Sequence, residues 1–427
     1  MPMRILVSVA AFLISFGFSI DAVAQQNDLE TPQQGLRSQR ALKTTSTLNS
    51  SRLLLAQSKL APRLLSAVAK KRAAGENIMI SPASLGMALA VVDLGADTAL
   101  KASIRTALAL ESRIENDRKP ARDDLDLLRK LVTKLETDRA LSNIFIAANA
   151  IYIDPMSQPT MRTLDKVAQS GAVVFREPLG DGTLARINGW VSSKTKGLIP
   201  SILERSPAEA ELIALNAVYF KDKWRVQFDE GKTQQMPFHR LDGSSHNVPM
   251  MLTTIDKVSL RTDQSFVAVD LQYTHRRFSL MLVTTLETPR PASAFEAIGG
   301  WLGGDGFNER EAEVLLPRFE LIDSVDMLEP LEGLGLQSGL ASPTSLKGFS
   351  NKPISVTQIV QKTILQVDEA GTTAAAATAA TFSRSMADGG AASIVFDKPF
   401  VFALLDHATG AILLYGYVGD PKQGRTE

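Results

Sequence analysis

The sequence predicts an α+β fold built as one large domain. Apolar residues recur at helical spacing in the first third of the chain, whereas short apolar runs typical of strands dominate the last half. Helical and strand-like segments do not alternate regularly, which favours α+β over a regularly alternating architecture. The 427 residues contain no internal repeat and no Pro/Ser-rich linker after residue 50, so one domain is the simplest interpretation.

The expected helices follow from apolar spacing and from signals at their ends. Ser81-Pro82 precedes the second helix, because proline is favoured in a first helical turn, and Gly95 suits its end. Residues 111–140 are rich in charge and predict one or two amphipathic helices with solvated faces. In chain order the expected helices are 53–72, 83–94, those within 111–140, and 185–195 closed by Gly197.

Strands are expected where apolar runs are short and bounded by turn residues. The last two runs are separated by residues 406–410, which predict a hairpin with a longer loop. In chain order the expected strands are 143–153, 212–220, several short strands within 236–290, 313–321, 359–367, 394–405 and 411–418.

The first 24 residues predict a secretory signal peptide. Arg4 supplies a positive charge, residues 5–20 are almost wholly apolar, and Ala22-Val23-Ala24 is similar to a small-x-small cleavage site. The apolar stretch is too short and wrongly flanked for a good transmembrane anchor, which is the alternative interpretation. We therefore expect cleavage after about Ala24, a flexible lead-in over residues 25–50, and a protein secreted to the extracellular space or the periplasm.

Charge and composition exclude several classes of protein. Lys plus Arg and Asp plus Glu each number 46, so the chain has no net positive charge with which to collect nucleic acid. The absence of cysteine excludes disulfide scaffolds, Cys-based zinc sites and thiol catalysis. None of the four histidines has the H-E-x-x-H spacing of a zinc protease, and neither metal nor cofactor is expected. His275 and His407 lie in loop-like contexts and are interpreted as polar surface residues.

Catalytic motifs are also missing. There is no G-x-S-x-G nucleophile elbow, no G-x-x-x-x-G-K-[ST] phosphate loop and no G-x-G-x-x-G motif. The short basic clusters Lys70-Lys71-Arg72 and Arg276-Arg277 suit a polyanion, but solvated helix ends or turns are the simpler interpretation. We therefore expect that the protein is not an enzyme. A secreted hydrolase with an unrecognised nucleophile is the rival hypothesis.

One segment has a composition that does not suit the strand-like runs on either side of it. Residues 367–386 hold six alanines between 374 and 380 and almost no large side chain before Phe382. Alanine favours helices and is poor in strands, so an exposed helix or a flexible linker is one interpretation. However, the segment lies between two strand-like runs, and long loops in compact domains are often functional. Small side chains at every second position would let this loop slide between two strands, so we infer a segment that switches conformation.

Over residues 50–421 the chain resembles the serpin family. Glu369 to Thr378 matches the hinge pattern E-x-G-T-x-A-A-A-A-T, and Asn77 to Ser84 matches the signature N-x-x-x-S-P-x-S. Further matches, in the family's order, are Asn149-Ala150-Ile151-Tyr152, Ile187-Asn188-Gly189-Trp190-Val191, Leu215 to Lys221 with Trp224, Val248-Pro249-Met250-Met251, Leu316-Pro317-Arg318-Phe319, and Phe396-Asp397 with Pro399-Phe400.

The resemblance implies a serpin fold of three β-sheets and eight to nine helices over residues 51–427, with an exposed reactive centre loop at about 371–390. In inhibitory members a target protease attacks this loop, and the acyl-enzyme is trapped when the loop inserts as a new strand in the central sheet. The free protein is then metastable. The hinge that enters the sheet first comprises Glu369, Gly371, Thr372, Thr373, Ala374, Ala375, Ala376, Ala377 and Thr378.

The resemblance also implies two regions, the shutter and the breach, at which the central sheet opens. They comprise Ser81, Ser84, Asn216, Gln361, Lys221 and Trp224. Gln361 stands where the family usually has histidine, and its amide still donates and accepts hydrogen bonds, so a link to Asn216 and the two serines is expected. Asp222 replaces a usual glycine and Thr373 a common glutamate, and we expect minor effects from both.

The hinge carries no proline or bulky residue through Ala380, which favours an irreversible suicide inhibitor over a non-inhibitory binding or chaperone-like protein. The commonest family register places the cleaved bond between Ser385 and Met386. Trypsin-like proteases favour Arg384–Ser385 instead, because arginine suits an acidic specificity pocket, and Phe382 suits chymotrypsin-like enzymes. The expected partner is a secreted serine protease, trypsin-like or elastase/subtilisin-like, with a cysteine protease as a further candidate. We expect a monomer without nucleic-acid or membrane partners.

Overall fold

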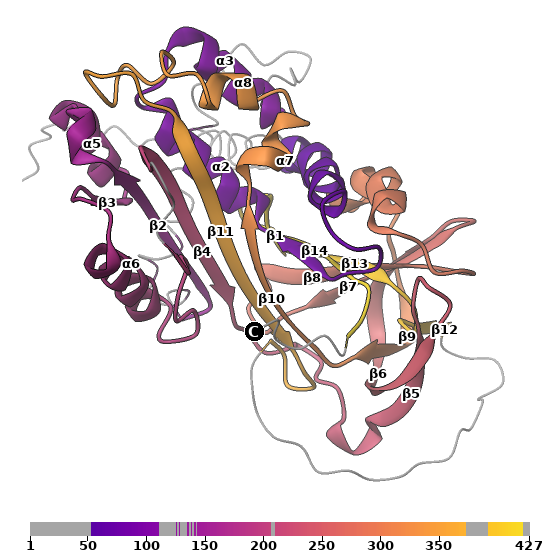
Figure 1. Cartoon of the computed structure of the whole chain (residues 1–427). Helices are drawn as coiled ribbons and strands as arrows, with labels where there is room; N and C mark the ends of the chain where they lie inside the picture. The colour runs from indigo at the N-terminus through magenta and orange to yellow at the C-terminus, as the bar shows by residue number, and fades with distance from the viewer. Residues whose placement is uncertain are drawn as a thin grey trace, which may run out of the picture. The chain divides into compact units, whose positions relative to one another are not determined.

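The computed structural model describes residues 53–110, 143–205, 210–372 and 392–421, together with residues 125, 128, 135, 138 and 141. These residues combine α-helices with two β-sheets, which confirms the α+β prediction (Figure 1). The expected signal peptide, the lead-in and residues 373–390 of the expected loop lie outside the described residues. So does most of the segment 111–140, of which Leu125, Leu128 and Leu135 are helical and buried.

Two α-helices begin at residues whose side chains cap them. Ser81 accepts a hydrogen bond from the Ser84 amide at the start of α2, with Pro82 as the first helical residue, and Asp97 caps α3 through the Leu100 amide. The α-helices among the described residues are 53–69, α2 (Pro82–Asp93), α3 (Thr98–Ala107), α5 (Met161–Gln169), α6 (Asp181–Lys194), α7 (Leu328–Glu332) and α8 (Gln337–Leu340), and the 3-10 helices are η1 (Pro155–Ser157), η2 (Glu230–Lys232) and η3 (Ala292–Gly303).

The larger sheet has nine strands in the order β1-β14-β13-β8-β7-β6-β9-β12, with β5 paired to β6. All of its neighbours are antiparallel except β9 and β12. The expected C-terminal hairpin is present as β13 and β14. The strands are β1 (Ile78–Ile80), β5 (Gln234–His239), β6 (Ser245–Thr262), β7 (Phe266–Gln272), β8 (Phe278–Thr285), β9 (Asn308–Pro317), β12 (Ala392–Val395), β13 (Phe400–Asp406) and β14 (Ala411–Val418).

The expected short strands within 236–290 are present as β5, β7 and β8, but β6 among them is long. The same strand explains why two hydrogen-bonded sheets are found where the family resemblance implies three. This strand is 18 residues long. Its first residues pair with β5, its middle with β9 and its last residues with β7. A register shift between Ile255 and Val258 allows the strand to bend while the ladder continues. Two groups of strands that would otherwise be separate therefore share one hydrogen-bonded sheet.

The smaller sheet has the order β10-β11-β4-β2-β3. Its central neighbours β11 and β4 are parallel, and we call the boundary between them the seam. All nine residues of β4 are buried and none is charged, as expected for a strand covered on both faces. The strands are β2 (Phe145–Ile153), β3 (Val173–Phe175), β4 (Leu212–Phe220), β10 (Phe319–Asp326) and β11 (Val356–Val367).

Two further strand predictions need correction. The expected strand 313–321 is two strands, because β9 ends at Pro317 in the larger sheet and β10 begins at Phe319 in the smaller one. The chain therefore crosses between the sheets at Arg318. The expected strand 394–405 is likewise divided into β12 and β13 by residues 396–399, which include a proline.

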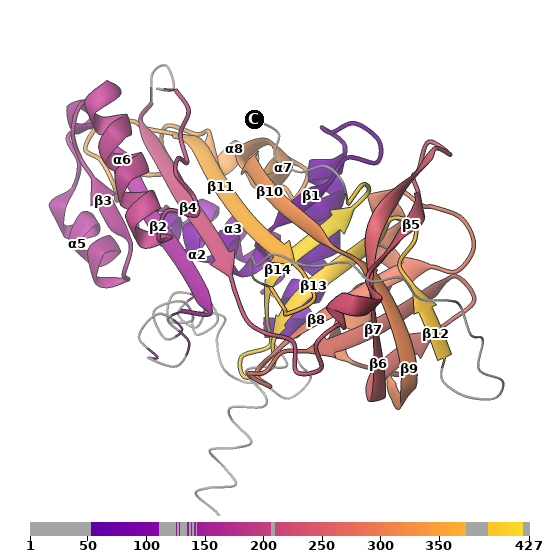
Figure 2. The same cartoon turned by 90° about the horizontal axis from the view of Figure 1, so that it is seen from below.

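Alternate residues of the smaller sheet enter different apolar clusters. Ile213, Leu215 and Tyr219 of β4 belong to a cluster with Ile187 and Val191 of α6, which covers one face of the sheet (Figure 2). The intervening residues of β4 enter the main core, where α2 contacts both β4 and β14. A strand inserted into the seam would therefore meet packed side chains on both faces.

Candidate functional site

The candidate site begins with a tight turn directly after β11. The Asp368 amide donates to the Gly371 carbonyl at 2.9 Å, and the Asp368 carboxylate accepts from the amides of Ala370 and Gly371, each at 3.0 Å. Burial raises the pKa of Asp368, although these two amide hydrogen bonds oppose the rise. The turn reverses the chain, so that Gly371 and Thr372 run back toward the seam. We call residues 368–372 the hinge turn.

Gly371 lies directly against the backbone that follows β4. A Cβ at residue 371 would lie 2.3 Å from the Asp222 carbonyl oxygen and 2.5 Å from Lys223 Cα, and the φ angle of Gly371 is +155°. Both the space and the backbone angle therefore require glycine. The Thr372 amide donates to the Asp222 carbonyl at 2.7 Å, and Gly371 forms an antiparallel bridge with Lys223.

Trp224 holds the other side of the hinge turn. Its indole Nε1 donates to the Asp368 carbonyl at 2.8 Å, and its amide donates to the Ala370 carbonyl at 3.0 Å. The indole stacks on Tyr273 with ring centroids 4.5 Å apart, and the Tyr273 hydroxyl lies 2.8 Å from the Thr372 hydroxyl. Thr372 is fully buried. Burial raises the pKa of Tyr273, so this phenol stays protonated as a hydrogen-bonding partner.

The carboxylate of Glu369 is buried beneath the turn and bonded to a cation. Nη2 and Nε of Arg318 lie 2.6 and 3.1 Å from its oxygens, and the Thr233 hydroxyl donates to it at 2.6 Å. Burial alone would raise the pKa of Glu369, but the hydrogen bonds from Arg318 and Thr233 outweigh burial, and the pKa lies below its usual range. Glu369 therefore stays ionised and fixes the turn.

Asp222, whose backbone carbonyl accepts the hydrogen bond from the hinge turn, also has a side-chain contact with His275. Nδ1 of His275 lies 3.2 Å from both carboxylate oxygens of Asp222, which is buried. We expected His275 to be only a polar surface residue and Asp222 to have a minor effect. His275 is exposed, yet it binds the residue whose carbonyl accepts the Thr372 amide.

In the middle of the seam, Gln361 of β11 connects both strands to α2. Its Oε1 accepts from the Ser81 amide at 2.7 Å, and its Nε2 donates to the Ser81 carbonyl at 3.1 Å and to Asn216 Oδ1 at 3.3 Å. Asn216 in turn donates to Asn149 of β2 at 2.6 Å. The Ser84 hydroxyl is buried and has no hydrogen-bond partner among the described residues. The seam is therefore held on its core side by side-chain as well as backbone bonds.

The seam is closed in its middle and open at the hinge. The last pair of its ladder is Ile364 with Tyr219, and residues 365–367 of β11 pair only with β10. Four residues beyond Tyr219, Lys223 pairs with Gly371 instead of with β11. The hinge turn thus occupies the position where β4 and β11 part.

The other sequence-predicted site residues are placed as follows. Lys221 is exposed and makes no side-chain hydrogen bond or ion pair within the described ranges. Outside the described residues lie Thr373, Ala374, Ala375, Ala376, Ala377, Thr378, Arg384, Ser385 and Met386. Sequence reasoning did not assign a role to Arg318, Tyr273 or Thr233. The one available signal was Glu369 itself, because a buried carboxylate requires a cation and hydrogen-bond donors.

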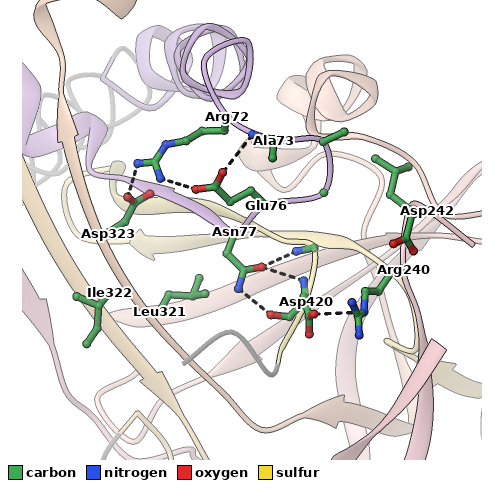
Figure 3. A pocket seen from close by; sticks show the side chains of 14 residues that line it. Arg72, Ala73, Glu76, Asn77, Arg240, Asp242, Leu321, Ile322, Asp323 and Asp420 are labelled. Atoms are coloured by element: carbon green, nitrogen blue, oxygen red, sulfur yellow. Dashed lines mark hydrogen bonds and ion pairs between the residues drawn. The ribbon is translucent and has the colours of Figure 1, made fainter. Parts of the chain in front are cut away.

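A cavity of about 450 Å³ lies away from the hinge (Figure 3). Its lining comes from residues 72–77, 240–242, 321–323 and 419–420. Arg72 pairs with Asp323 at 2.8 Å, and Arg240 pairs with Asp420 at 3.2 Å. Asn77 accepts the Asp420 amide and donates to its carbonyl. These contacts connect the segment before β1 to β10 through Arg72 and to Asp420, which follows β14, through Asn77.

Across the described ranges, no three His, Asp or Glu side chains gather closely enough to hold a metal ion. None of the helices in those ranges combines the length and apolar character needed to cross a membrane.

Comparisons with known proteins agree with this arrangement. A family model described as "Serpin (serine protease inhibitor)" matches residues 55–421. The chain is 28% identical to the plasma serine protease inhibitor of Homo sapiens over 356 residues, which are 82% of this chain and 86% of that protein. The structure of native protease nexin-1 with heparin covers 87% of this chain and is itself covered fully, with a TM-score of 0.72 and 22% identity. Thyroxine-binding globulin in complex with thyroxine gives a TM-score of 0.74 at 20% identity, over 87% of this chain and 99% of that one.

Proposed function

The chain belongs to the serpin family of serine protease inhibitors, and we propose that it is an irreversible suicide inhibitor of secreted serine proteases. In the proposed reaction the protease serine attacks a carbonyl of the reactive loop. An ester forms between the two proteins, and the amine of the next loop residue leaves as a new N-terminus. The segment behind the hinge turn then enters the seam as a strand and carries the esterified protease with it.

One observation carries the proposal: the hinge turn is in register with both strands of the seam. The Asp368–Gly371 hydrogen bond aligns the following residues antiparallel to β11, and the Lys223–Gly371 bridge aligns them antiparallel to β4. If each register continued into the following residues, both would put residue 375 between Ile364 and Tyr219, which are partners across the seam. Two separate pairings of the hinge turn therefore support insertion at the same position of the sheet.

The same register predicts where the inserted residues would lie. Thr378 would lie between Gln361 and Asn216, on the face where those side chains meet Ser81. Residue 383 would lie opposite Val356, the first residue of β11. Both candidate bonds, Arg384–Ser385 and Ser385–Met386, then follow directly beyond the far end of the sheet. Cleavage at either bond would leave the protease at that end, so both bonds stay candidates.

The remaining properties are part of the same proposal. We expect a monomer that is not a catalyst, that is secreted after loss of residues 1–24, and whose target is trypsin-like or elastase/subtilisin-like. A cysteine protease is a further candidate. The alternative is a non-inhibitory binding protein, because thyroxine-binding globulin, which shares the fold, forms a complex with thyroxine. The in-register hinge favours the inhibitor, because a protein that only binds a ligand gains nothing from a pre-aligned strand.

Incubation of residues 25–427 with trypsin, elastase and subtilisin, each separately, tests the proposal. The expected result is a complex that survives denaturing electrophoresis, with release of a C-terminal peptide. The mass of this peptide distinguishes cleavage after Arg384 from cleavage after Ser385. Cleavage without any stable complex, by every protease tried, would contradict inhibition and leave only the fold assignment.

A further inference from the structure

Asp222 lies in the segment that follows β4 and contacts both the hinge turn and His275. Its carbonyl accepts the Thr372 amide, and its carboxylate, of which only 5% is exposed, contacts His275. Oδ2 also accepts from the His275 amide at 3.3 Å, and Oδ1 accepts from the Lys223 amide at 2.8 Å. Asp222 therefore connects the hinge to a turn that follows β7. A glycine, which the serpin pattern usually has at this position, has no side chain with which to make that connection.

The turn that carries His275 is itself fixed to the larger sheet. Nε and Nη2 of Arg277 donate to the two oxygens of the buried Asp406 carboxylate in β13, each at 2.7 Å. The His407 amide donates to the Arg277 carbonyl at 2.8 Å. The Thr274 amide donates to the Lys223 carbonyl at 2.7 Å. The imidazole of His275 is thus carried by a turn that is fixed at both ends. This turn does not belong to β4 or β11, the strands that would separate on loop insertion.

The position of Asp222 relative to β11 has a direct consequence for insertion. Neighbouring strands are about 4.8 Å apart, so two strands that admit a third must lie about 9.6 Å apart. At Ile364 and Tyr219 the strands are direct neighbours, whereas at Asp222 the residue Thr372 already stands beside the continuation of β4. Segment 221–224 is therefore held where it would have to lie after insertion.

We propose that the Asp222–His275 contact is a positioning device that keeps the hinge end of the seam open and so sets how fast the cleaved loop inserts. The proposal rests on the proposed inhibitory function. Insertion competes with hydrolysis of the acyl-enzyme, so a slower insertion diverts more inhibitor molecules into cleaved, inactive product. Neither residue belongs to the loop that the protease attacks, so we expect the attack itself to be independent of the contact.

The test compares His275→Ala and Asp222→Gly with the wild type and with His275→Asn, whose side-chain amide supplies a donor in place of Nδ1. His239→Ala is the matched control, because His239 is an exposed histidine whose side chain makes no hydrogen bond or ion pair within the described ranges. With a protease that the wild type traps, trypsin being tried first, one measures the association rate and the number of inhibitor molecules consumed per protease trapped.

A single partly exposed ion pair changes a rate by only a modest factor. His275→Ala and Asp222→Gly should therefore each raise the number of inhibitor molecules consumed per trapped protease about two- to fivefold. The association rate should not change. His275→Asn and His239→Ala should match the wild type. An unchanged number in both test variants, or a His275→Asn variant as defective as His275→Ala, would overturn the proposal.

A second measurement separates this inference from the proposed function. Hydrogen exchange of the Thr372 amide, which donates to the Asp222 carbonyl, needs no protease. It should accelerate severalfold in Asp222→Gly and His275→Ala even if no protease is ever trapped. If the wild type traps no protease but exchange does accelerate, the inhibitory function fails and the positioning of the hinge stands. Unchanged exchange in both variants refutes the positioning role itself.

Discussion

Arg318 joins the hinge turn to the crossing between the two sheets, because its guanidinium lies 2.6 Å from the buried carboxylate of Glu369. Arg318 is the single residue between β9 in the larger sheet and β10 in the smaller one. The turn that would lead the loop into the seam is therefore attached to a residue at which the chain passes directly from one sheet to the other.

Replacing Arg318 with methionine should destabilise the hinge turn. The change leaves the Glu369 carboxylate buried with only Thr233 as a side-chain donor, and removal of one partner from a buried ion pair costs about 3 kcal/mol. Scanning calorimetry should show a clearly lower unfolding temperature. Arg310→Ala is the control, since Arg310 is exposed on β9 and has no ion pair among the described residues. Equal unfolding temperatures for the two variants would contradict this role of Arg318.

The same pair predicts a dependence on pH. The pKa of Glu369 is lower in the folded chain than its ordinary value, so the pair contributes stability above that ordinary value, about 4.3, and loses it as the pH falls through the folded pKa. The difference in unfolding temperature between the wild type and Arg318→Met should therefore shrink on acidification from pH 7. A difference that grew on acidification would mean that another group dominates.

Replacing Gln361 with leucine should weaken the seam. It removes three hydrogen bonds and leaves the Ser81 amide and Asn216 Oδ1 without these partners, at a cost of about 2–3 kcal/mol. A weaker seam admits the intact loop more readily, so the variant should lose inhibitory activity faster during storage. Gln366→Leu is the matched control, because Gln366 bonds to Glu320 of β10, away from the seam. If both variants decayed at the wild-type rate, Gln361 would not hold the seam closed.

Replacing Thr378 with glutamate should convert the inhibitor into a substrate. If the loop inserts in the proposed register, residue 378 would lie between Gln361 and Asn216, which are both buried, and a carboxylate there would be buried without a cation. The expected result on a denaturing gel is cleaved chain with no protease complex. Ala387→Glu, on the released side of both candidate bonds, should still form the complex. Complex formation by the Thr378 variant would show that the register is wrong.

Replacing Lys362 with methionine should stabilise the native chain. Lys362 of β11 points to the α6 side of the sheet, and burial lowers its pKa, although the charge of Glu204 opposes the effect. Removing the half-buried ammonium should gain about 1 kcal/mol at neutral pH. Thermal unfolding would measure the gain, with the exposed Lys347→Met as control.

The sign of the pH effect at Lys362 follows from its lowered pKa. Folding costs free energy while the ammonium is charged in the unfolded chain, and this cost falls as the pH rises through the folded pKa toward the ordinary value of about 10.4. The advantage of Lys362→Met over the wild type should therefore narrow between pH 7 and pH 10. If the stability difference between Lys362→Met and the wild type did not change with pH, the added stability would come from packing alone.

Elements with clear end signals were predictable from the sequence. The second helix was expected at 83–94 and runs from Pro82 to Asp93, and the strand 212–220 has the bounds expected for it. Both are continuous buried runs whose ends carry a proline, a glycine or a charge. The long strand β6 was not predictable, because its successive parts pair with three different strands, β5, β9 and β7, and only this tertiary pairing shows that they form one strand.

The candidate site was predictable only where a motif covered it. The motifs named Glu369, Gln361 and Asn216, and the structure brings Gln361 and Asn216 into contact, while their role in loop insertion stays a prediction. The partners that fix the hinge turn are distant in sequence: Arg318 is 51 residues from Glu369, and Tyr273 is 99 residues from Thr372. No periodicity or spacing relates such pairs. They meet because the end of β9, the start of β10 and the turn after β7 all lie beside the hinge turn.

The fit of Gly371 against the Asp222 carbonyl also has a genetic consequence. Every amino acid reached from a glycine codon by one nucleotide change carries a Cβ, and at residue 371 that atom would lie 2.3 Å from a backbone oxygen. No missense change of one nucleotide at this codon leaves the turn intact. The alanine codons that follow can mutate to serine or threonine at a smaller steric cost. If the loop is the site that proteases attack, its residues can therefore change by mutation and alter which protease is bound, whereas Gly371 in the hinge turn has to stay the same.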